Sequence, residues 1–349
     1  MSISLSIHLR NLTHPPTMNN QDSNKFCVVE GQSSFLFYYY FNFVSYFLAV
    51  RKQWQKRNAN VIAGLLVFKL HLKMIISRNG SEKAVQSITE EEFQRIPEFR
   101  HREDALACLF GRLLLRHSAQ KFTGEDWKNI KFERTERGKP YLVSPPETTF
   151  GLNVSHQGDY VAFASSCSSK VGVDIMRLDK ERNNKTADEY INSMAKSASP
   201  EELRMMRSQP TEAMKMTMFY RYWCLKEAIL KATGVGIMKD LNSLDFRVNM
   251  SDRYRPGCFV TSTTVNEDGK LQEQWVFEET FADTNHSAAV CKEKKLPREC
   301  VFRQDPEAKI FFSKITFSTL LENAEIINPM PNDAVDVFEE FMKKPRKTF

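Results

Sequence analysis

Apolar residues recur at helical spacing around the stretch RYWCLKEAILKATGVG, residues 221–236. The apolar stripe consists of Met218, Tyr222, Leu225, Ile229 and Ala232. At 3.6 residues per turn these positions share one face, which predicts a helix packed against a core. Glu227 and Lys231 stand one turn apart on the opposite side, and Gly234 favours the left-handed turn that ends a helix. The Glu227 and Lys231 side chains form either a solvated ion pair or part of a functional site.

Alternating residues predict strands upstream of this helix. The segment VGVDIM, residues 171–176, puts its β-branched residues on one face and Gly172, Asp174 and Met176 on the other. Aspartate has a poor propensity for a strand, and such a local conflict is typical of a functional site. Residues 153–166 predict two strands joined by a tight turn.

Helices are predicted further upstream. Thr89 and Glu92 form a capping-box pattern that opens a short helix, and a longer helix is predicted from about Phe99 to Phe122. We expect most of the arginines around these helices to lie on solvated surface. They are Arg95, Arg100, Arg102, Arg112 and Arg116.

A basic turn follows the predicted strand at residues 130–134. The sequence ERGKPYL turns at Gly138 and Pro140 and gathers Arg134, Arg137 and Lys139. This turn is either a solvated basic loop or a loop that binds phosphate. Further along, residues 181–209 form a polar connection, and residues 243–290 predict short strands and hairpins.

The two ends of the chain differ from the rest. An apolar run at Ser33–Val50 is followed by the basic cluster Arg51–Arg57. We expect residues 1–80 to be an extension outside the fold; the alternatives are a membrane anchor and strands that join the fold. The basic run KKPRK, residues 343–347, is either a solvated terminus or a targeting signal.

Composition places the chain among globular proteins. Its 349 residues, 42% hydrophobic and 26% charged, suffice for one large or two modest domains. The net charge of +6 favours anionic partners, but the basic residues lack interleaved aromatic residues, so we expect no nucleic acid. The seven cysteines are scattered without a C-x-x-C pair, which indicates neither a disulfide framework nor a zinc site and favours a reducing compartment.

Four segments now stand in order: RTERGKP, NVSHQGDY, VGVDI and WCLKEAILKATG. Together they resemble the Sfp-type 4′-phosphopantetheinyl transferases, most closely the animal members, over about Thr89 to Cys291. The resemblance implies an α+β fold of two pseudo-symmetric α+β halves with the active site in the cleft between them. The halves would span residues 81–165 and 166–300, and residues 301–349 would pack on the core and end in the basic tail.

The resemblance also implies an activity, the transfer of 4′-phosphopantetheine from coenzyme A to a serine of apo acyl-carrier domains such as those of fatty acid synthase. This is the reaction of a holo-[acyl-carrier-protein] synthase, which releases 3′,5′-ADP and depends on Mg²⁺, with Mn²⁺ as an alternative. Asp174 and Glu227 would hold the metal, and Glu227, Asp174 and Lys231 would be catalytic. The coenzyme A site would comprise Arg95, Arg134, Thr135, Arg137, Gly138, Lys139, Asn153, Ser155, His156 and Lys231.

One position departs from the family pattern. Many members carry a glutamate two residues after the GVD aspartate, where this chain has Met176. The alternative function is therefore a catalytically weak protein that binds coenzyme A or a carrier domain. We expect a cytosolic monomer with neither nucleic acid nor membrane as a partner.

Overall fold

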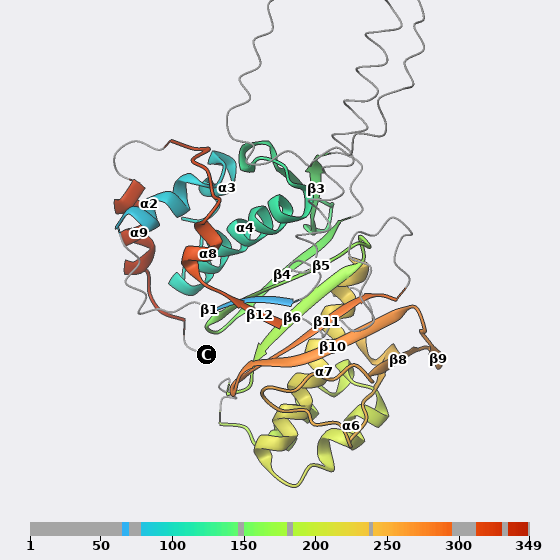
Figure 1. Ribbon diagram of the computed structural model, residues 1–349. Coiled ribbons are helices and arrows are strands. Elements are labelled where there is room, and N and C mark those ends of the chain that lie inside the picture. Colours follow the sequence, from blue (N-terminus) through green and yellow to red (C-terminus); the bar gives the residue numbers. More distant parts are fainter. Residues whose placement is uncertain are drawn as a thin grey trace, which may run out of the picture. The chain divides into compact units, whose positions relative to one another are not determined.

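The computed structural model describes residues 65–69, 78–145, 150–179, 184–236, 240–294, 312–329 and 334–347 (Figure 1). Helices and strands are mixed along these residues, which confirms the α+β class. The apolar run Ser33–Val50 and the cluster Arg51–Arg57 lie outside the described residues. None of the described helices has both the length and the apolar character required to cross a bilayer.

The first part of the fold is built on helix α4 (Arg102–Thr123), which packs on a four-stranded sheet. The sheet has the order β12-β1-β5-β4, with β1 at Leu65–Lys69, β4 at Gly151–Gln157, β5 at Tyr160–Ser166 and β12 at Phe312–Ile315. Around α4 lie α2 (Arg78–Gln86), α3 (Glu90–Gln94), α8 (Phe317–Leu321) and α9 (Ala334–Lys343), as Figure 1 shows. The 3₁₀ helix η2 (Trp127–Asn129) precedes the hairpin of β2 (Lys131–Arg134) and β3 (Pro140–Ser144).

The second part is built on helix α7 (Glu212–Thr233), which packs on a sheet of order β10-β11-β6. Its strands are β6 (Val171–Arg177), β10 (Trp275–Asp283) and β11 (His286–Glu293). A smaller sheet joins β7 (Leu244–Arg247), β8 (Thr264–Glu267) and β9 (Lys270–Leu271). The remaining helices are α5 (Ala187–Ser193), η3 (Ala195–Ser197), α6 (Pro200–Arg207) and η4 (Leu241–Ser243).

The two long helices form as the sequence predicts. All five residues of the predicted apolar stripe on α7 are buried, and the helix ends at Gly234 with φ of 70°. Helix α4 ends in the same way at Gly124, with φ of 72°. Only a residue without a Cβ adopts this conformation at little cost, so each glycine ends its helix. The capping box of Thr89 and Glu92 is also confirmed.

The two parts meet along β4 and β6, and side chains make the connection. Asn153 Oδ1 accepts a hydrogen bond from the backbone N–H of Val173 at 2.9 Å, and Gln157 Oε1 accepts one from the N–H of Arg177 at 2.6 Å. Because alternate residues of a strand share a face, Asn153, Ser155 and Gln157 all point toward β6. Behind this seam, β5 and β6 pack through an apolar cluster of their own.

One expectation from the sequence is wrong, and the structure adds three details that the patterns did not indicate. Residues 1–80 do not all lie outside the fold, because β1 pairs with β5 and β12 and α2 begins at Arg78. The polar connection at residues 181–209 contains helices α5 and α6. Arg112 and Arg116 are buried instead of solvated. Finally, Cys167 is disulfide-bonded, whereas Cys108, Cys224, Cys258 and Cys291 are free thiols.

Candidate active site

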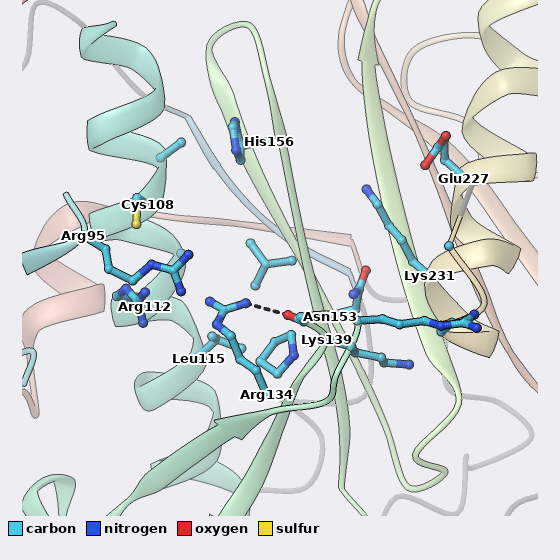
Figure 2. A pocket seen from close by; sticks show the side chains of 18 of the residues that line it. Arg95, Cys108, Arg112, Leu115, Arg134, Lys139, Asn153, His156, Glu227 and Lys231 are labelled. Carbon is cyan, nitrogen blue, oxygen red and sulfur yellow. Dashed lines mark hydrogen bonds between the residues drawn. The ribbon is translucent and has the colours of Figure 1, made fainter. Parts of the chain in front are cut away.

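A cavity of about 450 Å³ opens between the two parts of the fold. Helix α4, strand β4, the turn before β3 and the end of α7 form its walls. Figure 2 shows Arg95, Arg112 and Arg134 on one side and Glu227 and Lys231 on the other. Of the predicted site residues, those in the cavity wall are Arg95, Arg134, Arg137, Gly138, Lys139, Asn153, His156, Glu227 and Lys231.

Asp174 and Lys231 meet in a network beside this cavity. Lys231 Nζ donates to Asp174 Oδ1 at 2.7 Å and to Ser155 Oγ at 2.8 Å, and Ser155 Oγ donates to the same Asp174 oxygen at 2.8 Å. Asp174 and Ser155 are buried, and the side chain of Lys231 is 27% exposed. The lysine of α7, the aspartate of β6 and the serine of the NVSHQ motif are therefore in direct contact.

Gly172 allows this contact, because α7 lies directly on the backbone of β6. A Cβ at Gly172 would lie 2.1 Å from Ala228 O and 2.4 Å from Ala232 N. The missing side chain lets the helix approach, so that Lys231 reaches Asp174 two residues along the same strand face. Met176, the next residue on that face, is buried in the apolar core around α7.

Glu227 stands one turn before Lys231 in the cavity wall and is half-buried. Burial raises the pKa of its carboxyl group, the negative charge of Asp174 raises it further, and the positive charge of Lys231 opposes both. The two carboxylates are thus close enough to act on each other electrostatically. A carboxylate with a raised pKa in a cavity is suited to accept a proton near neutral pH.

The oxygens around Asp174 fit a divalent cation. Asp174 Oδ2 is buried and has no hydrogen-bond partner, although buried polar atoms are nearly always paired. Together with Glu227 it offers two carboxylate groups, and Mg²⁺ commonly takes one or two carboxylates and completes its shell with water and substrate phosphate. Among the described residues no cluster of three or more His, Cys, Asp or Glu side chains is suited to a metal, so a larger protein shell is not offered there.

Three guanidinium groups gather on the opposite wall. Partial desolvation of its guanidinium group lowers the pKa of Arg134, and the positive charges of Arg112 and Arg95 lower it further. Arg95 and Arg134 are exposed to the cavity, whereas Arg112 is buried and donates to Glu92 Oε1 at 3.3 Å. Like charges this close repel one another, so an anion bound among them would be stabilised.

Two cationic side chains of the basic turn, Arg137 and Lys139, donate hydrogen bonds to backbone carbonyl groups of α7 and its neighbours. Lys139 Nζ donates to Ala232 O at 3.0 Å and Val171 O at 3.1 Å, and Arg137 donates to Gly234 O at 3.5 Å. Burial lowers the pKa of Lys139 to about 8. Thr135 closes the turn by accepting from the N–H of Lys139 at 3.1 Å. The side chains of Lys139 and Thr135 thus make hydrogen bonds to backbone groups. Thr135 lines a second cavity, of about 530 Å³.

The motif NVSHQ has two roles in the structure. Asn153 and Ser155 point across the seam to β6, as described above, and Ser155 is not part of the cavity wall. His156 points the other way and lies at one end of the cavity (Figure 2). The residue as a whole is exposed, but desolvation of the imidazole by the surrounding protein lowers its pKa, which favours the neutral ring.

Arg112 belongs to the site and was missed because its role depends on a distant partner. It lies on the face of α4 that also carries Cys108, Gly111 and Leu115, and all four line the cavity. Gly111 was the available signal, because a glycine in the middle of a long helix often marks close packing. It faces Val154 of β4, with 3.4 Å between a Cβ at that position and Val154 Cγ1. Lys226, next to Glu227, is instead buried in an ion pair with Glu202 at 2.9 Å.

Comparison with known proteins agrees with this geometry. Residues 77–168 match the family described as 4′-phosphopantetheinyl transferase, N-terminal, and residues 170–291 match the 4′-phosphopantetheinyl transferase superfamily. All of the residues around the cavity that are named above fall within these two matches.

Three relatives illustrate the similarity. The L-aminoadipate-semialdehyde dehydrogenase-phosphopantetheinyl transferase of Mus musculus is 34% identical over 219 residues, 60% of this chain and 69% of the mouse protein. The Xenopus laevis protein of the same name is 32% identical over 269 residues, 75% and 86% of the two chains. The 4′-phosphopantetheinyl transferase of Bacillus subtilis is 26% identical over 213 residues, 59% and 89% of the two chains. The chain therefore belongs to the 4′-phosphopantetheinyl transferase superfamily.

Proposed function

We propose that this protein transfers 4′-phosphopantetheine from coenzyme A to a serine of an apo acyl-carrier domain, such as that of fatty acid synthase, and releases 3′,5′-ADP. It would then be a holo-[acyl-carrier-protein] synthase. The observation that carries the proposal is one cavity with the Glu227 carboxylate and the Lys231 ammonium on one wall and three guanidinium groups on the other, with the Asp174 carboxylate bound to Lys231 beside the cavity. Coenzyme A carries a diphosphate and a separate 3′-phosphate. The diphosphate would match the wall with Glu227 and Lys231, and the 3′-phosphate would match the wall with the guanidinium groups.

Asp174 Oδ2 and the carboxylate of Glu227 would hold Mg²⁺, or Mn²⁺ in its place. A bound divalent ion would polarise the diphosphate and neutralise charge on the leaving nucleotide. Met176 supplies no oxygen, so water and substrate phosphate would fill the remaining positions. Lys231 holds Asp174 in position through Oδ1 and leaves Oδ2 open for the cation.

Arg95 and Arg134 would bind the 3′-phosphate of coenzyme A, since guanidinium groups suit phosphate oxygens. Arg112 stands behind them and is itself held by Glu92. His156 and Lys231 would contact the diphosphate from the other end of the cavity. Arg137, Gly138 and Lys139 would enclose the nucleotide mainly through the backbone of their turn, because the Lys139 ammonium is engaged by carbonyl groups.

Glu227 would accept the proton of the carrier serine as its oxygen attacks the phosphorus atom. Its raised pKa makes the carboxylate a stronger base than an exposed glutamate. The serine oxygen gains the phosphopantetheinyl group, and the bond from phosphorus to 3′,5′-ADP breaks.

Intact-mass spectrometry tests the proposal. The protein is incubated with an apo acyl-carrier domain of fatty acid synthase, coenzyme A and Mg²⁺, and the carrier should gain the mass of one phosphopantetheine. Glu227→Ala and Asp174→Ala should remove this gain. Calorimetric binding of coenzyme A without any gain on several carriers would instead support the binding-protein alternative. We also propose a cytosolic monomer, which cell fractionation and light scattering would check.

A further inference from the structure

The basic segment Lys343–Lys347 is bound to the protein at the beginning of α4. Pro345 O accepts a hydrogen bond from the N–H of Arg102 at 3.1 Å, which satisfies one of the free N–H groups at the helix start. Lys344 Nζ donates to Pro97 O and Phe99 O, both at 2.9 Å. The segment is therefore held against the protein surface, although Lys343, Pro345, Arg346 and Lys347 remain exposed to solvent.

A second set of contacts fixes the other end of the segment. The backbone N–H of Lys347 donates to Glu103 Oε2 at 2.9 Å, and Lys347 Nζ pairs with Asp104 Oδ1 at 3.0 Å. Arg346 Nε lies 3.6 Å from Glu103 Oε1, while most of its side chain is exposed. The contacts are made through both backbone and side chains, so the segment has a defined place.

That place is beside the mouth of the cavity. Phe99, whose carbonyl holds Lys344, lines the cavity, and so does His156. Burial lowers the pKa of His156, and among the charges acting on it those of Asp104 and Lys347 are foremost. The basic segment thus lies next to the His156 end of the cavity wall.

The segment makes this part of the surface basic. At the beginning of α4, Arg100 and Arg102 balance the carboxylates of Glu103 and Asp104, and the segment adds four cationic side chains at positions 343, 344, 346 and 347. The formal balance changes from 0 to +4. Lys343 and Arg346 are exposed and face solvent, as does Arg100 just before the helix.

We propose that the basic segment is a docking surface for an acidic face of the carrier domain that presents the acceptor serine. This rests on the proposed function, because a serine that enters the cavity brings the surrounding carrier surface against its mouth. Cations at the rim of an interface mainly raise the rate of association with an acidic partner and make it depend on salt. Coenzyme A would enter the arginine-lined part of the cavity, so its KM should not depend on the charge of the segment.

The test is a double charge reversal, Lys343→Glu with Arg346→Glu, in the full-length protein. Lys343 makes none of these contacts, and Arg346 contributes only the ion pair with Glu103 at 3.6 Å, whereas the hydrogen bonds that hold the segment are made by Lys344, Pro345 and Lys347. The matched control is Lys128→Glu with Lys270→Glu, which changes the charge by the same amount at two exposed positions elsewhere. Transfer to the apo-carrier is measured at several salt concentrations, together with the melting temperature of each variant.

The reversal should raise KM for the carrier on the order of tenfold at low salt, leave KM for coenzyme A unchanged, and flatten the salt dependence. The control should behave like the wild type. An unchanged carrier KM in an active enzyme would overturn the inference, and so would a rise confined to coenzyme A. A wild-type protein without transfer on any carrier would instead mean that the proposed function is wrong.

Discussion

Lys231 Nζ lies 2.7 Å from Asp174 Oδ1, so a helix and a strand 57 positions apart in the chain form an ion pair beside the cavity. The other oxygen of Asp174 is buried without a partner. A carboxylate that is half satisfied by the protein is prepared to receive a cation on its free side. The ion pair therefore fixes the direction in which Asp174 presents its second oxygen.

Asp174→Asn should lower transfer by at least about 100-fold, comparable to the loss of one preorganised electrostatic contact in other active sites. The amide keeps the shape of the side chain but loses the charge that would bind a metal. Binding of Mn²⁺ in the presence of 3′,5′-ADP, followed by electron paramagnetic resonance, should weaken in parallel. Asp240→Asn, at an exposed position, is the control, and equal Mn²⁺ binding by both variants would contradict the metal assignment.

Glu227→Gln should abolish transfer and at the same time raise the melting temperature at pH 7. The pKa of Glu227 is raised in the folded protein, so the folded state holds a proton more tightly than the unfolded state. Stability consequently falls as pH rises from 4.5, the unfolded value, through the folded pKa. The glutamine variant lacks this loss, so the two melting temperatures should converge near pH 4. Calorimetry at both pH values measures the difference, and a less stable variant at pH 7 would be inconsistent with the raised pKa.

Lys139→Met should cost about 1–3 kcal/mol of stability, because it leaves carbonyl groups of Val171 and Ala232 without a donor. Hydrogen exchange should accelerate at the last amides of α7 and in the basic turn. Affinity for 3′,5′-ADP, measured by calorimetry, should fall less than it does in Arg134→Ala. Lys131→Met, at an exposed position on β2, is the control. A large loss of affinity with unchanged stability would mean that Lys139 acts on phosphate instead.

Sequence patterns predicted the features of the site that depend on near neighbours. The stripe on α7, the glycine at its end and the face of β6 that carries Asp174 all follow from periods of 3.6 and 2 residues. These periods report which side of an element is buried. They say nothing of which distant element covers it.

The residues that were misjudged depend on partners far away in the chain. Arg116 is buried because Glu92, 24 positions earlier, and the carbonyl of Ile130 accept its hydrogen bonds. Asn153 connects β4 to β6 through a backbone N–H, 20 positions away, that no pattern identifies. The family resemblance supplied the pairing of Asp174 with Glu227, but not the engagement of Lys139 by the end of α7.

Gly172→Ala should separate α7 from β6 and disable the site without touching any charged residue. The new Cβ would lie 2.1 Å from Ala228 O, 2.4 Å from Ala232 N and 2.9 Å from the carbonyl carbon of Lys231. All three are backbone atoms, so the helix itself must move. Overpacking of this kind costs about 1–3 kcal/mol or more. The displacement would carry Lys231 away from Asp174, and transfer should fall with it.

Gly111→Ala is the matched test, because the same atom is added to helix α4 on the opposite wall of the cavity instead of to strand β6 beneath α7. Its Cβ would meet only the Val154 Cγ1 methyl at 3.4 Å, and a side-chain methyl can shift slightly. Alanine also favours a helix over glycine by about 0.5–1 kcal/mol, so this variant should be more stable than the wild type. Urea unfolding should therefore move in opposite directions for the two substitutions. If Gly172→Ala were as stable and as active as the wild type, close approach of α7 to β6 could not be what brings Lys231 to Asp174.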